Sequence, residues 1–190
     1  MILHAGDVSS RGTETEIIKF LEWFESLDYQ YKIFIAGNHD FFFENNSLEK
    51  IASIIPPSIT YLNDSGTTIE GVKIWGSPIT PWFFDWAFNR QRGVEIKKHW
   101  DLIPVDTDIL ITHGPVHGIL DKTKTGVAAG CEELLKKVEN LNIKLHLSGH
   151  IHEGYGERIV NGVHYINASV LDIKYRQVND PIDLPFTLEE

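Results

Sequence analysis

Residues 32–40 read KIFIAGNHD, in which an apolar run is followed at once by a glycine and three polar side chains. The apolar run is typical of a buried strand, and Gly37 allows the chain to turn sharply where that strand ends. Asn38, His39 and Asp40 then stand at the carboxyl end of the strand. We expect these side chains to be functional, with an Asx-turn as the plain structural alternative.

The same arrangement of apolar run, glycine and polar side chain occurs at three other places. These runs end at Gly6-Asp7, at Thr112-His113-Gly114 and at Ser148-Gly149-His150-Ile151-His152. Because ligands bind beyond the carboxyl ends of strands in open α/β sheets, four such strand ends are expected to bring their side chains to one place. The converging residues would be Asp7, Asn38, His113, His150 and His152.

Taken one at a time, these motifs have ordinary structural interpretations. A Gly-Asp pair after a strand is usually a turn capped by its own Asp, and a Gly-His-Ile-His segment can be the polar face of a strand. On a strand, His150 and His152 would point to the same side, which suits chelation. All four motifs together, in this order, make a metal site the better interpretation.

The ligand types indicate which ions such a site would bind. Histidine nitrogen combined with carboxylate and amide oxygen suits Mn, Fe, Zn or Ni better than an all-oxygen Mg or Ca cage. A carboxylate such as that of Asp7 can bridge two ions about 3.5–4 Å apart, as in two-metal phosphatases.

Composition limits the other classes of function. The 190 residues, 42% of them hydrophobic, are enough for a single domain over 1–190. One cysteine, Cys131, excludes a disulfide framework and a Cys-rich zinc site, and the first ten residues do not form a secretory signal, so we expect a cytoplasmic protein. A net charge of −10 makes nucleic acid an improbable partner, and the apolar runs are too short for a membrane-spanning helix.

Short strand-like runs alternate with helical runs, which predicts an α/β or α+β layered fold. A capping box at residues 13–16 opens the first helix, and Asn161-Gly162 is a strong hairpin signal. Strands are expected at residues 1–5, 32–36, 59–62, 67–69, 72–75, 108–111, 144–147, 158–160 and 163–166, and two further helices at 47–55 and 131–141, with an aromatic loop at 78–92.

Gly-Asp, Gly-Asn-His-Asp, a strand-terminal His-Gly and Gly-His-x-His, in this order, resemble the motifs of the calcineurin-like metallophosphoesterases. The segments ILHAGDVSSRGT, WGSPITPWFFDWAFN and GHIHEGYG are similar to a narrower group, the metallophosphoesterase-domain-containing proteins of the brain fetal protein 239 type. That group resembles class III nucleotide phosphodiesterases. The resemblance implies a four-layer sandwich of two mixed β-sheets flanked by helices.

The resemblance also implies a role for each matching residue. Asp7 would bridge two metal ions. Asn38, His113 and His150 would bind one of them, and His152 would bind the other. His39 would protonate the leaving oxygen, with Asp40 orienting its imidazole.

The family's first motif, Asp-x-His, has no counterpart upstream of Gly6 in this sequence. The resemblance then implies a fold without its first strand and an exposed sheet edge, which predicts a homodimer contact. It also leaves one ion, held by Asp7, Asn38, His113 and His150, and so predicts reduced activity.

Two functions remain open on the sequence. One is a metal-dependent phosphoester hydrolase, a phosphodiesterase acting on a small nucleotide-like substrate. The other is a non-catalytic scaffold that keeps the fold. The aromatic loop at 78–92 either walls the cleft and stacks on a nucleobase or packs as a small core, and packing is the favoured interpretation.

Overall fold

Strand β2 (Lys32–Ile35) forms where the apolar run predicts it, and all four of its residues are buried in the computed structural model, which describes residues 1–185. β1 (Ile2–His4) and β3 (Ile59–Leu62) pair with β2 in parallel on either side. The resulting three-stranded sheet has the order β1-β2-β3, which leaves β1 at its edge. The homodimer contact expected at an exposed edge stays a prediction.

The second sheet has six strands in the order β10-β11-β9-β8-β5-β4. Its four inner strands run parallel, and the edge strands β4 and β10 pair antiparallel with their neighbours. Its strands are β4 (Ser65–Ile69), β5 (Val72–Ser77), β8 (Ile109–Thr112), β9 (Leu145–Ser148), β10 (Gly156–Val160) and β11 (Val163–Asn167), and a separate pair is formed by β6 (Thr80–Pro81) and β7 (Asn89–Arg90).

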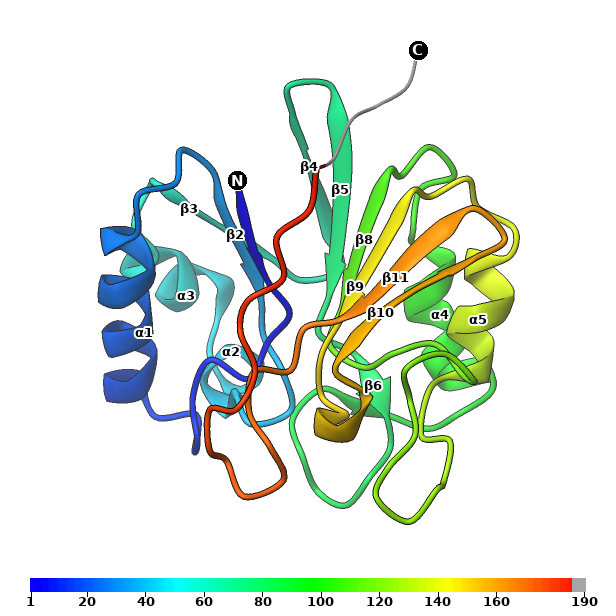
Figure 1. Cartoon of the computed structure of the whole chain (residues 1–190). Coiled ribbons are helices and arrows are strands. Elements are labelled where there is room, and N and C mark those ends of the chain that lie inside the picture. The colour runs from blue at the N-terminus through cyan, green and yellow to red at the C-terminus, as the bar shows by residue number, and fades with distance from the viewer. Residues whose placement is uncertain (186–190) are drawn as a thin grey trace.

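Helices cover the outer face of each sheet (Figure 1). Helix α1 (Glu14–Ser26) begins with the predicted capping box, in which Thr13 Oγ1 accepts a hydrogen bond from the backbone of Glu16 and the Glu16 carboxylate accepts one from the backbone of Thr13. Beside α1 lie α2 (Phe41–Asn45) and α3 (Leu48–Ile54), and the six-stranded sheet carries α4 (Val94–Asp101) and α5 (Glu132–Val138).

The period-two alternation of the strands divides the core into layers. Ile33 and Ile35 of β2 join Ile109 and Ile111 of β8 in one buried cluster between the two sheets. Phe34 belongs to the other buried cluster, on the helix-facing side, together with residues of α1. The order helix, sheet, sheet, helix confirms the predicted α/β sandwich (Figure 1).

Some boundaries differ from the sequence prediction. β4 begins at Ser65, two residues before the strand expected at 67–69, because Ser65 pairs with Gly76 of β5 and extends the ladder. α5 is shorter than predicted and ends at Val138. Two helices were not predicted: the short helix α2, directly after Asp40, and α4. No helix within residues 1–185 has the length and apolar character needed to cross a bilayer.

Candidate metal centre

Strands β1, β8 and β9 end toward the lower side of the molecule in Figure 1, and a predicted ligand follows each of them. Asp7 follows β1, His113 follows β8 and His150 follows β9. One ligand atom from each of these residues lies within 4.8 Å of the others. The side chains come from both sheets, so the packing of one sheet on the other creates the cluster.

The imidazole of His113 is buried and held at both of its nitrogens. Its Nδ1 lies 2.7 Å from the carbonyl oxygen of Ala5, and its Nε2 lies 2.9 Å from Asn38 Oδ1 and 3.3 Å from Asp7 Oδ2. Metal-binding histidines characteristically give their second N–H to a backbone carbonyl, which fixes the tautomer and aims the other nitrogen at the ion. The structure therefore brings the side-chain oxygen of Asn38 to the cluster as a further candidate metal ligand.

The charges in the cluster compensate one another. Burial alone would raise the pKa of Asp7, but the adjacent His113 outweighs it, so the pKa of Asp7 lies below its usual range. Burial lowers the pKa of His113, but Asp7 outweighs that effect and the pKa is raised. Burial and the charge of His113 lower the pKa of His150 to about 3, so its lone pair is free. Binding a cation to this donor set would release the proton shared by His113 and Asp7.

The ligand loops are held in rarely populated backbone conformations. Asp7 has φ 57° and His150 has φ 65°, both in the left-handed region that non-glycine residues seldom adopt. Such conformations persist only where the surrounding structure stabilises them, and they are found most often at functional sites. The nitrogen, carboxylate and amide donors, aimed at one point by strained turns, fit a divalent transition-metal ion.

Gly37 lies against two of these ligands and leaves no room for a side chain. A Cβ at this position would lie 2.3 Å from Asp7 Oδ1 and 2.6 Å from His113 Cε1. Gly37→Ala is therefore expected to displace both ligands, to lower the free energy of unfolding by about 1–3 kcal/mol and to weaken ion binding. Chemical denaturation and calorimetric titration with Mn²⁺ measure the two effects.

Gly114→Ala is the matched control for this prediction. Gly114 adjoins His113, and the nearest atom to an added Cβ is Thr80 Cγ2 at 3.5 Å, an ordinary contact. We expect it to keep the stability and the ion affinity of the wild type. Equal ion affinity in the Gly37 and Gly114 variants would show that the close packing at Gly37 is irrelevant to the ligands.

His39 and Asp40 lie beside the cluster, but their relationship differs from the expected one. His39 Nδ1 lies 3.0 Å from the carbonyl oxygen of Ser10, so this carbonyl, and not the Asp40 carboxylate, orients the imidazole. Nothing in the sequence marks Ser10 for this role, because any residue can supply a backbone carbonyl.

Asp40 instead ties two strand ends together. Its carboxylate accepts hydrogen bonds from the backbone N–H groups of Val8, Ser9 and Gly37, and from the Ser9 hydroxyl at 2.6 Å. Burial and the nearby Asp7 carboxylate raise the pKa of Asp40 to about 6. Its position corrects the expectation that it orients His39: it holds the loop of Asp7 against the loop of Asn38.

His152 lies outside the compact group formed by Asp7, His113 and His150. The chain turns at His150 and enters a short 3₁₀ helix, η1 (His152–Gly154), so the expected strand geometry for the two histidines is wrong. Its Nδ1 lies 2.9 Å from the carbonyl oxygen of Asp172, which leaves Nε2 available. Nothing in the sequence marks Asp172 for this contact, because a backbone carbonyl twenty positions away leaves no local signal.

Different residues of the aromatic loop at 78–92 pack in the core, face solvent or lie beside the candidate site. Phe88 is buried in the core, as packing requires, whereas Trp82, Phe83 and Phe84 are exposed. Trp86 lies against His39, with ring centroids 4.4 Å apart. Ala87 also donates its backbone N–H to the carbonyl oxygen of Asn38 at 3.1 Å, so the loop contacts the candidate site through Trp86 and Ala87.

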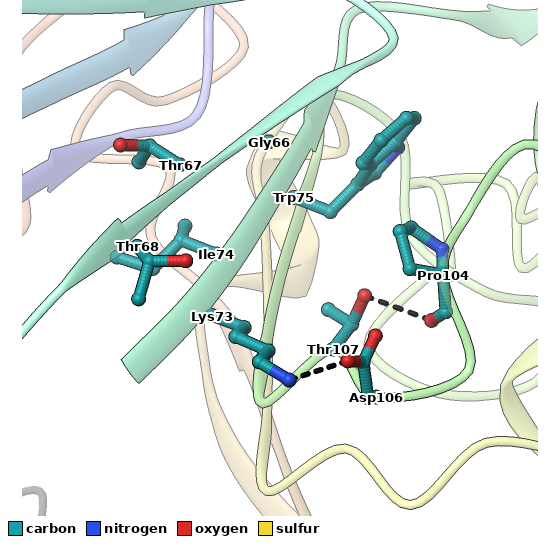
Figure 2. A pocket seen from close by; sticks show the side chains of 9 residues that line it. All are labelled: Gly66, Thr67, Thr68, Lys73, Ile74, Trp75, Pro104, Asp106 and Thr107. Atoms are coloured by element: carbon teal, nitrogen blue, oxygen red, sulfur yellow. Dashed lines mark hydrogen bonds and ion pairs between the residues drawn. The ribbon is translucent and has the colours of Figure 1, made fainter. Parts of the chain in front are cut away.

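A separate hollow of about 300 Å³ lies at the opposite ends of the strands (Figure 2). Lys73 near the start of β5 and Asp106 before β8 form an ion pair in its wall, and Thr107 bonds the carbonyl of Pro104. The side chains that line it include no histidine. Its groups already bond to one another, so it offers no comparable set of converging ligands.

Comparison with known proteins agrees with this geometry. Residues 1–154 match the family described as "Calcineurin-like phosphoesterase". The human protein named metallophosphoesterase domain-containing protein 1 is 42% identical over 211 residues, which cover 97% of this chain and 64% of the human protein. A UPF0046 protein of Caenorhabditis elegans is 35% identical over 181 residues, covering 89% of this chain and 62% of that protein. The chain thus spans less than two thirds of the length of these relatives.

Solved structures show the same fold at low sequence identity. Phosphopantetheinyl hydrolase from Mycobacterium tuberculosis superimposes with a TM-score of 0.55 at 13% identity, over 88% of this chain and 78% of that one. The protein TT1561 of Thermus thermophilus gives a TM-score of 0.54 at 13% identity, over 82% of this chain and 69% of that one. With the family match over most of its length, the chain belongs to the calcineurin-like phosphoesterase family.

Proposed function

We propose that the chain is a metal-dependent phosphoester hydrolase, and more narrowly a phosphodiesterase acting on a small nucleotide-like substrate in the cytoplasm. The observation that carries the proposal is the compact group of Asp7, His113 and His150, with Asn38 Oδ1 2.9 Å from His113 Nε2. These four residues would hold a divalent ion such as Mn, Fe, Zn or Ni. His152 stands outside this group and would serve a second ion.

A divalent ion bound there would act as a Lewis acid toward water and the phosphoryl oxygens. His39 supplies the proton for the leaving group. Ser10 O accepts the N–H of Nδ1, so Nε2 is the nitrogen that faces the substrate. In the general-acid form of His39, the proton on Nε2 passes to the leaving oxygen as a water oxygen adds to phosphorus and the P–O bond breaks. Asp40 keeps the loops of Asp7 and Asn38 in register during this step.

The net charge of −10 favours a small substrate over a polyanion, because an acidic surface repels nucleic acid at long range. A small phosphoester carries little charge, which a bound divalent ion would compensate locally. A small substrate is therefore the better match to this chain.

Two measurements on the same protein test the proposal. Mn²⁺ is titrated into metal-free protein by calorimetry, and hydrolysis of bis-p-nitrophenyl phosphate is followed at the saturating ion concentration. We expect ion binding together with Mn²⁺-dependent turnover. Ion binding without turnover of this or any other phosphoester would establish the scaffold alternative instead.

A further inference from the structure

Two aromatic rings from distant parts of the chain contact the imidazole of His39. The Trp86 ring, from the loop between β6 and β7, lies 4.4 Å from it at an interplanar angle of 40°. The Tyr175 ring meets it edge-on, with centroids 5.9 Å apart and an angle of 77°. Tyr175 also lies 5.6 Å from the ring of His152. Aromatic surface therefore adjoins the group that would protonate the leaving oxygen.

Tyr175 is held in place by a turn built around Asp172. The Asp172 carboxylate accepts hydrogen bonds from the backbone N–H groups of Lys174 and Arg176 and from the Arg176 guanidinium. The carbonyl oxygen of Asp172 accepts from the backbone of Tyr175 at 2.8 Å and faces His152 Nδ1 at 2.9 Å. The same residue thus positions the Tyr175 backbone and the His152 imidazole.

The conformation of Tyr175 is unusual for a residue on a surface turn. Its φ is 58°, in the left-handed region that is unfavourable for a bulky residue. Its side chain is nonetheless 63% exposed, so core packing does not explain the placement. A ring that is fixed by its backbone, exposed to solvent and adjacent to two site histidines is available to a ligand.

We propose that Trp86 and Tyr175 determine substrate specificity by binding a flat, π-bearing group on the leaving side of the phosphoester. This inference rests on the proposed function, since it takes His39 as the proton donor. The leaving oxygen must come within hydrogen-bonding distance of His39, so the group attached to that oxygen emerges next to the two rings. Stacking accepts any flat ring, because every nucleobase and aryl group has a π-face.

The proposal is tested by binding, with ligands that the enzyme does not cleave. Phenylphosphonate and cyclohexylphosphonate carry rings of six carbons, one flat and one puckered, on a C–P bond that phosphoester hydrolysis does not break. Their dissociation constants are measured by calorimetry on the Mn²⁺-loaded protein. We expect phenylphosphonate to bind about fivefold more tightly, within the range for a favourable aromatic contact.

Variants assign this preference to the two residues. Trp86→Leu and Tyr175→Leu should each weaken phenylphosphonate binding by about threefold or more, while cyclohexylphosphonate affinity stays within about twofold of the wild type, because the apolar area remains. Tyr175→Phe keeps the ring and should keep the preference. Phe83→Leu, an exposed aromatic position on the same loop as Trp86, is the matched control and should change neither affinity.

The outcomes separate the specificity role from the proposed function. Equal affinity of the wild type for the two phosphonates, or a preference that survives in both leucine variants, overturns the role of Trp86 and Tyr175 while leaving the hydrolase proposal intact. Failure of both phosphonates and of methylphosphonate to bind the Mn²⁺-loaded protein overturns the specificity role, and it overturns the hydrolase proposal as well if Mn²⁺-dependent turnover of bis-p-nitrophenyl phosphate is also absent. If Trp86 and Tyr175 only oriented His39, their leucine variants would change turnover without changing the phosphonate preference, and this result would also overturn the specificity role.

Discussion

His113→Ala is expected to abolish high-affinity Mn²⁺ binding and to lower phosphodiester turnover by at least about 10²–10³-fold, the range for losing one preorganised electrostatic group. His113 is 1% exposed, and its Nε2 faces Asn38 Oδ1 and Asp7 Oδ2 while its Nδ1 is held by the Ala5 carbonyl. Gly6 and Gly37 pack directly against its ring, since a Cβ at either position would lie within 2.7 Å of an imidazole atom. Calorimetric titration and initial rates measure the two effects.

The same substitution also changes the charge of Asp7. His113 keeps the pKa of Asp7 below its usual range, so removing the imidazole leaves a buried carboxylate that is easier to protonate. A protonated Asp7 is a poor ligand. The loss of ion affinity in His113→Ala should therefore deepen as the pH falls toward the ordinary pKa of an aspartate, and measurements at two pH values would reveal it.

His164→Ala is the control for His113→Ala. His164 lies on β11 and its Nε2 pairs with Glu157 at 2.8 Å, outside the Asp7, His113 and His150 group. Ion affinity and turnover should match the wild type. If His113→Ala bound Mn²⁺ with the stoichiometry and affinity of this control, the assignment of the metal centre would be refuted.

His39→Gln is expected to leave ion binding intact and to lower kcat by about 10²–10⁴-fold for esters with poor leaving groups, the usual contribution of a general acid. The side chain of His39 is not a member of the compact ligand group, and its Nδ1 is committed to Ser10 O. The remaining nitrogen carries the proton that an alkoxide needs. Rates on a methyl and a p-nitrophenyl diester, with calorimetric ion titration, check this.

Comparing the rate loss for two leaving groups shows whether His39 acts as the general acid. p-Nitrophenolate departs as a stable anion and needs little protonation, so its rate should fall far less than that of the methyl ester. A loss of equal size for the two esters would indicate that His39 stabilises the phosphoryl group instead of donating a proton. A loss of ion affinity would indicate that the substitution disturbs Asp7, whose Oδ1 accepts from the backbone of His39.

Much of the fold could be predicted from local signals. KIFI is buried as β2, the Thr13–Glu16 capping box opens α1, and Asn161-Gly162 joins β10 to β11. In each case the determining chemistry is contained within a few consecutive residues: apolar periodicity, a side-chain cap or a turn that needs positive φ. The short helix α2 escaped prediction because its residues FFFEN lack helical periodicity over that length.

Part of the site could also be predicted. Asp7, Asn38 and His113 stand where glycine-bearing strand ends place them, and His150 joins them. The prediction for Asp40 was wrong because its partners are backbone amides of another loop, which leave no trace in the sequence. The geometry expected for His152 was wrong because the chain leaves the strand direction at His150.

By itself, the sequence determined the strand ends, the metal-binding types of side chain and the resemblance to a phosphoesterase family, because each depends on residues close together along the chain. Only the tertiary structure decided which donors meet, that Ser10 and Asp172 orient the histidines, and that Trp86 and Tyr175 lie beside His39. These contacts join separate loops of two packed sheets, and their geometry depends on how the sheets and turns pack rather than on any local pattern.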